Sequence, residues 1–117
     1  MPTPPLPALS IVVPMFNEEE SVTPLVDAVR DALASHPSWE LVLVDDGSRD
    51  RTVEIASALS SADPRVVLLQ LARNYGQTQA MQAGFDRARG RIVVSMDGDL
   101  QNDPRDIPLL VAKLDEG

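Results

Sequence analysis

The most informative stretch of the sequence is Arg91-Ile92-Val93-Val94-Ser95-Met96-Asp97-Gly98-Asp99-Leu100-Gln101-Asn102-Asp103-Pro104. It begins with a short apolar run rich in β-branched residues, which predicts a buried β-strand. The run ends in two carboxylates, Asp97 and Asp99, separated only by Gly98, which permits a sharp turn. In open α/β sheets ligands bind beyond the carboxyl ends of the strands, so both carboxylates lie where chemistry is expected.

These two carboxylates suggest a cation site. Carboxylates this close repel each other unless a proton or a cation lies between them. Mg²⁺ or Mn²⁺ is the simplest candidate, because these hard ions prefer oxygen ligands. A lone Asp-x-Asp is more often a solvated acidic turn, so the metal prediction depends on what the rest of the chain places beside it.

Composition limits the class of protein. The 117 residues suffice for one domain with one core, and the apolar fraction of 44% is ordinary. The net charge of −8 argues against a nucleic-acid partner. Because Lys113 is the only lysine and cysteine is absent, a phosphate site would need arginines, backbone N–H groups or a bound metal. Disulfides and thiolate metal sites are excluded.

Hydrophobic periodicity predicts alternating strands and helices after an extended proline-rich leader, residues 1–8. The expected strands are 9–14, 39–44, 65–71 and 92–96. The expected helices are 22–36, 52–61 and 77–89, with a fourth after Asp106. Ser21 and Asp50 are candidate N-caps, and Gly90 is the expected C′ residue of the third helix. This order predicts a three-layer α/β/α domain around a mostly parallel sheet with right-handed crossovers.

The strand order places several acidic groups together. If the first three strands wind in the order 3-2-1, the fourth lies on the other side of the first, and the topological switch point falls between them. Pro14 to Glu18 and Asp97 to Gln101 would then line one crevice, with Asp45-Asp46 beside them. Such a crevice suits a metal bound to a diphosphate, because the metal neutralises charge on a leaving phosphate. Asp45 or Asp46 could accept hydrogen bonds from a base or a ribose hydroxyl, although Asp45-Asp46-Gly47-Ser48 alone would usually be a turn with a helix cap.

Other classes of protein fit less well. A dinucleotide-binding domain would have Gly-x-Gly-x-x-Gly after the first strand, where this chain has Pro14-Met15-Phe16-Asn17-Glu18. A sugar nucleotidyltransferase would carry a glycine-rich loop with Arg or Lys at the same place. A receiver-like signalling module would have its acidic pair after the first strand and a lysine that closes the site.

Four motifs occur in order and at fitting separations: residues 11–19 (IVVPMFNEE), 44–52 (VDDGSRDRT), 73–76 (RNYG) and 96–104 (MDGDLQNDP). Together they resemble the family 2 inverting glycosyltransferases with the GT-A fold, a Rossmann-like nucleotide-diphospho-sugar transferase fold. The last motif is most similar to that of the polyprenyl-phosphate hexose transferases, such as dolichol-phosphate mannose synthase. The resemblance covers nearly the whole chain, residues 9–117.

The resemblance implies roles for individual residues. Around the nucleotide base and ribose it places Pro14, Phe16, Glu18, Val44, Asp45 and Asp46. Asp97 and Gly98 would contact the ribose or a phosphate. Asp99 would be the main protein ligand of Mg²⁺ or Mn²⁺, with Asp97 and Gln101 beside it, and Asp97 and Asp99 would form the catalytic pair. Two departures are Phe16 in place of a common tyrosine, and Asn102-Asp103-Pro104 in place of Asp-Pro-Pro-Glu.

The implied activity is transfer of a hexose, with inversion, from a UDP- or GDP-sugar to polyprenyl phosphate. It implies a cytoplasmic protein, or one at the cytoplasmic face of a membrane with which the full-length protein associates. Alternatives are a cell-wall or surface polysaccharide acceptor, or a nucleotide-binding fragment without turnover. Family members continue well beyond this length, so residues 9–117 are expected to be the donor-binding part of a GT-A domain truncated at its C-terminus.

Overall fold

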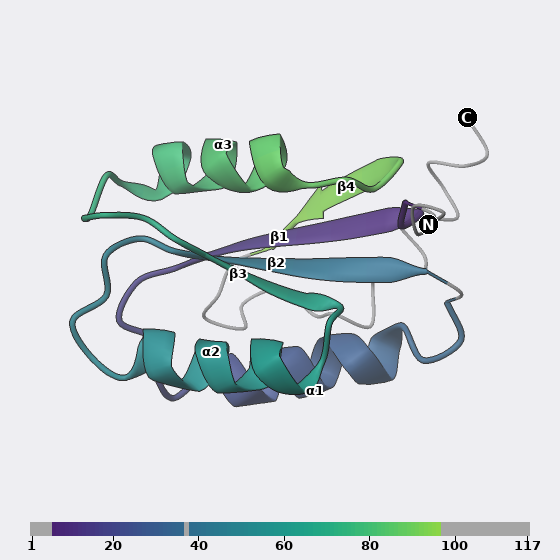
Figure 1. Ribbon diagram of the computed structural model, residues 1–117, viewed down its shortest axis with the longest axis horizontal. Coiled ribbons are helices and arrows are strands. Elements are labelled where there is room, and N and C mark those ends of the chain that lie inside the picture. Colours follow the sequence, from purple (N-terminus) through teal and green to yellow (C-terminus); the bar gives the residue numbers. More distant parts are fainter. Residues whose placement is uncertain (1–5, 37, 97–117) are drawn as a thin grey trace, which may run out of the picture.

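The computed structural model describes residues 6–36 and 38–96, which form a parallel sheet with helices on both faces (Figure 1). The strands are β1 (Leu9–Met15), β2 (Trp39–Asp45), β3 (Val66–Gln70) and β4 (Ile92–Ser95). The helices are α1 (Val22–Ala32), α2 (Thr52–Ala62) and α3 (Gln77–Arg87). All the predicted strands and the first three predicted helices are therefore present, and the expected last helix lies outside the described residues.

The sheet has the order β3-β2-β1-β4, and all three neighbouring pairs are parallel. Leu9 at the start of β1 pairs with Trp39 of β2 on one side and with Ile92 of β4 on the other. The chain therefore winds outward from β1 to β3 and then crosses to the far side of β1. This confirms the predicted switch point between β1 and β4.

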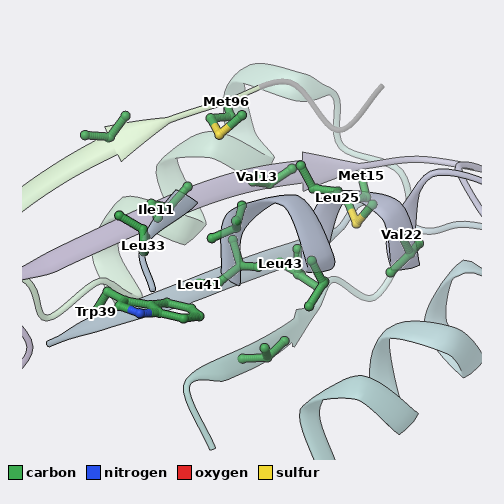
Figure 2. Close-up of a cluster of buried hydrophobic side chains, with 14 of the residues drawn as sticks. Ile11, Val13, Met15, Val22, Leu25, Leu33, Trp39, Leu41, Leu43 and Met96 are labelled. Atoms are coloured by element: carbon green, nitrogen blue, oxygen red, sulfur yellow. The ribbon is translucent and has the colours of Figure 1, made fainter. Parts of the chain in front are cut away.

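Helices α1 and α2 cover one face of the sheet and α3 covers the other, which gives the predicted three layers (Figure 1). Successive side chains of a strand point to opposite faces, so β1 supplies both cores. Ile11, Val13 and Met15 pack with α1 in the larger core (Figure 2). Val12 lies in the smaller core beneath α3. Two buried faces explain why the strand sequences are almost continuously apolar.

Helix α3 approaches the sheet closely because Gly84 faces it. A Cβ atom at this position would overlap Cγ1 of Val12 and would lie 2.9 Å from Cγ2 of Val44. Ala80, one turn earlier, is fully buried in the same layer. Small residues at these two positions therefore allow α3 to pack close to the sheet.

Three helix ends differ in detail from the prediction. Helix α1 stops at Ala32 rather than near His36. Ser21 makes no side-chain hydrogen bond to the start of α1. The N-cap residue of α2 is Arg51 rather than the predicted Asp50. Asp50 precedes it, and its Oδ1 accepts the backbone N–H of Thr52, the first residue of the helix (2.9 Å).

The prediction that α3 runs to Arg89 and ends at Gly90 is wrong, because Ala88 already has extended backbone angles (φ −62°, ψ 138°). Gly90 instead donates its N–H to the Ser10 hydroxyl (2.7 Å). That hydroxyl donates to the buried Glu40 carboxylate (2.6 Å), which also accepts the N–H of Arg89 (2.7 Å). Hydrogen bonds to the second residues of β1 and β2 thus hold the turn into β4 in place.

Strand β4 is half-buried. The prediction of a buried strand at residues 92–96 is therefore wrong in this respect. Val94 is buried, but Val93 is 39% exposed and Ser95 is exposed. Within the described part of the chain β4 pairs with β1 alone, and α3 packs over β1 and β2. Its outer edge and one face are therefore uncovered by the described residues.

An ion-pair cluster joins the elements at the amino ends of β2 and β3. Asp63 accepts from Arg65 (3.0 Å) and from Arg30 of α1 (3.1 Å), and the Arg65 guanidinium lies 4.3 Å from the ring centroid of Trp39. The hydrogen bond from Arg65, together with the one from Arg30, lowers the pKa of Asp63 to about 2. The cluster therefore fixes the end of α2 against α1 and two strands.

We expect Gly84→Ala to lower the free energy of unfolding by about 1–3 kcal/mol, because the added methyl group overpacks the layer between α3 and the sheet. Denaturant unfolding measures the change. Gln79→Ala is the control at an exposed position of the same helix and should change stability by less than about 0.5 kcal/mol. An unchanged or higher stability of Gly84→Ala would contradict the close packing.

The lowered pKa of Asp63 predicts a pH dependence of stability. A carboxylate with a lowered folded-state pKa stabilises the protein above its unfolded pKa of about 3.9, and this is lost as pH falls through the folded value. Asp63→Asn should therefore be less stable than the wild type at neutral pH, and the difference should shrink as the pH falls toward about 2. Unfolding curves across that range test this; a difference independent of pH would contradict it.

Candidate functional site

The carboxyl ends of β1, β2 and β3 form one continuous edge of the sheet. The backbone N–H of Asp46 donates to the carbonyl of Met15 (2.8 Å), and that of Leu71 donates to the carbonyl of Asp45 (2.9 Å). Parallel pairing thus continues to the last residue of each strand before its loop begins. The loops after these strands meet at the end of the sheet where ligands bind in open α/β folds.

The loops after β1 and β2 are bonded into one unit around Asn17. Its φ angle of 53° is in the left-handed region, which asparagine tolerates better than most residues. The N–H of Asn17 donates to the Ser48 hydroxyl (2.8 Å), and its Oδ1 accepts the N–H of Arg49 (2.8 Å). The N–H of Glu18 donates to the Thr52 hydroxyl (2.9 Å). This reciprocal bonding holds the rim of the site in place.

The Asp46 carboxylate holds the loop after β3. Its Oδ1 accepts the N–H of Tyr75 (2.8 Å), and its Oδ2 accepts the N–H of Gly76 (3.0 Å) and the side-chain amide of Asn74 (3.3 Å). Gly47 allows the two loops to touch, because a Cβ atom there would overlap the backbone N of Asn74. Its φ of 80° also favours glycine.

A pocket of about 440 Å³ opens between these loops. Its walls come from the residues after β1, β2 and β3: Phe16, Asn17, Asp45, Gly47, Ser48, Arg49, Gln70, Leu71, Ala72, Arg73 and Asn74. The carboxylate in it belongs to Asp45, which is only 2% exposed. Oδ2 of Asp45 accepts the N–H groups of Gly47 (3.2 Å) and Ser48 (3.1 Å). Its Oδ1 is buried and has no hydrogen-bond partner among the described residues.

A buried acceptor without a partner costs about 1–3 kcal/mol, so the unpartnered Oδ1 of a residue that lines a pocket points to a ligand that donates to it. Two arginines, Arg49 and Arg73, line the same pocket. The guanidinium of Arg73 also lies 5.0 Å from the ring centroid of Tyr75, a cation–π distance. The pocket therefore offers a buried acceptor with cationic donors beside it.

The structure separates the residues predicted around the base and ribose into four groups. Phe16 and Asp45 line the pocket, and the Phe16 ring is 42% exposed. Glu18 lines a neighbouring hollow of about 300 Å³ beside the start of α1. Pro14 and Val44 are buried within paired strands and lie below this edge. Asp46 is buried with both oxygens bonded to the loop after β3.

The predicted metal and phosphate residues Asp97, Gly98, Asp99 and Gln101 lie outside the described residues, so their roles stay predictions. Within 6–36 and 38–96, no three side chains of His, Asp or Glu lie close enough together to hold a metal ion. No helix in that part of the chain is long and apolar enough to cross a membrane.

Sequence reasoning gave no role to Asn17, Ser48, Arg73 or Asn74, which build the rim or wall of the pocket. A signal was present for two of them, because Arg73-Asn74-Tyr75-Gly76 stood out as a motif. Its partner could not be inferred, because Asp46 lies nearly thirty residues earlier in the chain and meets it only through the sheet.

A model described as glycosyl transferase family 2 matches residues 10–117. Among curated relatives, dodecaprenyl-phosphate galacturonate synthase of Rhizobium johnstonii is 55% identical over 109 residues, covering 92% of this chain and 32% of the relative. Undecaprenyl-phosphate 4-deoxy-4-formamido-L-arabinose transferase of Salmonella choleraesuis is 43% identical over 115 residues, covering 97% of this chain and 35% of the relative.

Solved structures agree in fold. A mannosyltransferase from Pyrobaculum calidifontis, in complex with GDP-Man and Mn²⁺, superposes with a TM-score of 0.79 at 24% identity, covering 94% of this chain and 32% of that one. TarS from S. aureus, residues 1–349 in complex with UDP-GlcNAc, gives a TM-score of 0.72 at 26% identity, covering 92% and 31%.

The present chain spans about a third of the length of the curated relatives that it matches. The match to the family model nevertheless runs from the first strand to the last residue. The strand order, the three layers and the superposed structures show the same architecture. The chain belongs to glycosyl transferase family 2 and has the GT-A fold.

Proposed function

We propose that this chain is the donor-binding part of a glycosyltransferase that moves a sugar from a uridine-diphosphate sugar to polyprenyl phosphate. The observation that carries the proposal is that Asp45 lines the pocket at the carboxyl edge of the sheet and has a buried Oδ1 without a hydrogen-bond partner among the described residues. Both curated relatives described above are named for sugar transfer involving dodecaprenyl or undecaprenyl phosphate, which supports a lipid-phosphate acceptor. Such an acceptor is already an anion and can attack without a general base.

Uracil matches the hydrogen-bonding pattern of the pocket better than guanine or cytosine. The pairing edge of uracil has one donor, N3–H, between two carbonyl oxygens. Asp45 offers one acceptor without a partner, Oδ1, because its Oδ2 is used by two backbone N–H groups. Arg73 lines the same pocket and can donate to a carbonyl. Guanine presents two adjacent donors, and N3 of cytosine is an acceptor that would face the Asp45 carboxylate. The ring of Phe16 adds a stacking surface, which is worth about 1–3 kcal/mol per base.

We propose that Mg²⁺ or Mn²⁺ binds Asp99, with Asp97 and Gln101 beside it, and that Asp97 and Gly98 contact the ribose or a phosphate. Two carboxylates and an amide are hard oxygen donors that suit either ion. The ion would neutralise charge on the leaving diphosphate. In a chain with net charge −8 and one lysine, an ion is the simplest source of that neutralisation. Asp97 and Asp99 are the proposed catalytic pair.

The proposed acceptor is a membrane lipid, so we propose that the full-length protein works at the cytoplasmic face of a membrane. The donor pocket is built from loops at one end of the sheet. A lipid phosphate would have to reach the same end, since transfer requires both substrates at one site.

The metal prediction is tested with Asp99→Asn in the full-length protein. We expect UDP to bind with Mn²⁺ and to stabilise the protein by about 2.7 kcal/mol at a hundredfold excess over Kd. A chelator, or Asp99→Asn, should remove this gain. Uridine is the control ligand, because it lacks the diphosphate and should bind equally with and without metal. Unchanged Mn²⁺-dependent affinity of the variant, measured by calorimetry, would show that Asp99 is not the ligand.

The base prediction is tested with Asp45→Asn. The backbone N–H groups of Gly47 and Ser48 will orient the new amide with its oxygen toward them, so its NH₂ faces the pocket. An acceptor thereby becomes a donor, and the protein should change from preferring UDP to preferring CDP, whose base accepts at N3. Competition binding measures the ratio of the two affinities.

The matched control is Asp86→Asn, which removes the same charge at an exposed position of α3 and should leave the ratio unchanged. Two results would contradict the proposal for the base. One is a wild type that binds GDP or CDP as tightly as UDP. The other is an Asp45→Asn protein whose affinities for UDP and CDP fall in equal proportion.

A further inference from the structure

The two neighbouring carboxylates at the end of β2 have different surroundings. Asp45 lines the pocket and has one oxygen without a partner among the described residues, whereas both oxygens of Asp46 accept hydrogen bonds from the loop after β3. The backbone carbonyl of Asp46 also accepts the side-chain amide of Asn74 (3.1 Å). Four hydrogen bonds therefore join this one residue to Asn74, Tyr75 and Gly76.

The charge of Asp46 is also satisfied without a cation. Gly76 is the N-cap residue of α3, and its carbonyl accepts the N–H of Ala80 (3.0 Å). The carboxylate thus lies at the positive end of an eleven-residue helix, where a negative charge is favourable. Hydrogen bonds from backbone N–H groups to a carboxylate are among the stronger ones in proteins. Asp46 is therefore bonded in place before any ligand binds.

The loop that Asp46 holds carries Arg73 into the pocket. The start of the loop is fixed by the bond from the N–H of Leu71 to the carbonyl of Asp45 (2.9 Å), and its end is fixed by the Asp46 carboxylate. Arg73 lies between these two attachments and lines the pocket with Asp45. Its guanidinium packs over Tyr75, whose own backbone N–H is bonded to Asp46.

We infer that Asp46 is a positioning residue rather than a nucleotide ligand: its carboxylate holds the 73–76 loop so that Arg73 meets the base opposite Asp45. This inference rests on the proposed function of the pocket. The two carboxylates then have different roles. Asp45 accepts from the base directly, and Asp46 acts on the base only through Arg73.

A double-mutant cycle for UDP affinity in the full-length protein tests the inference. Arg73→Gln should weaken UDP binding roughly ten- to hundredfold, as for loss of a charged hydrogen bond. Asp46→Asn should weaken it by a similar factor, because asparagine has one acceptor oxygen for two backbone N–H groups. The Asp46→Asn/Arg73→Gln protein should bind no more weakly than Arg73→Gln alone. Independent, multiplicative losses would overturn the inference.

A second measurement separates positioning from general support of the fold. The ratio of affinities for UDP and N3-methyl-UDP reports the contact to Asp45, because the methyl group removes the donor. Asp46→Asn should keep this ratio while losing affinity for both ligands, and Glu54→Gln, an exposed carboxylate in α2, should change neither quantity. If Asp46→Asn binds UDP and N3-methyl-UDP equally well, the substitution disturbs the contact to Asp45 too. That result would overturn the inference.

Asn74→Ala keeps the test decisive if Asp46→Asn does not fold. It removes only the side-chain amide that bonds to Asp46, and its loss should likewise disappear in an Arg73→Gln background; a multiplicative loss again counts against the inference. Failure of the proposed function has a different signature, namely a wild type that binds no UDP or prefers GDP. If the wild type binds UDP but the losses in the double-mutant cycle multiply, the role of Asp46 is rejected and the proposed function is not.

Discussion

The site depends on the parallel pairing at the carboxyl end of β2, where the chain leaves the sheet through two consecutive aspartates. Successive residues of a strand point to opposite sides, and Asp45 and Asp46 continue this alternation. Asp46 follows Val42 and Val44, which lie beneath α3, and it meets the start of that helix. Asp45 points to the opposite side, lines the pocket and has one oxygen without a partner among the described residues. One strand end thus places two identical side chains in two different environments.

The negative net charge of the chain does not destabilise this edge of the sheet, because N–H groups nearby stabilise the two buried carboxylates by hydrogen bonds. Asp45 accepts from two backbone N–H groups and Asp46 from two backbone groups and an amide. Such bonds replace the hydration that burial removes. Of the four oxygens of these two aspartates, only Oδ1 of Asp45 has no partner among the described residues, and a ligand that donates to it would offset the cost of its burial.

Much of the fold could be predicted from the sequence, because apolar runs, their spacing and the alternation of strands with helices depend on local pattern. The strand order followed from one assumption about winding, and the structure confirmed it. The alternation of side chains along a strand could also have shown that Asp46 lies on the same face as Val42 and Val44, and that Asp45 lies on the opposite face. What could not be predicted was the bonding between distant loops, such as Asn17 with Ser48 or Gly90 with Ser10, since neither pattern nor propensity encodes such pairs.

Polar side chains join different elements at the two ends of the sheet. This explains how a small domain can hold a site in which a buried oxygen of Asp45 has no partner among the described residues. At the amino end, Asp63 with its arginines joins helices to strands, and Glu40 with Ser10 joins β1 and β2 to the turn into β4. At the carboxyl end, the same kinds of side chain hold loops instead. A mutation at the amino end therefore acts first on the stability of the layers. A mutation at the carboxyl end acts first on loop placement, because the strands beneath it are fixed by two buried cores.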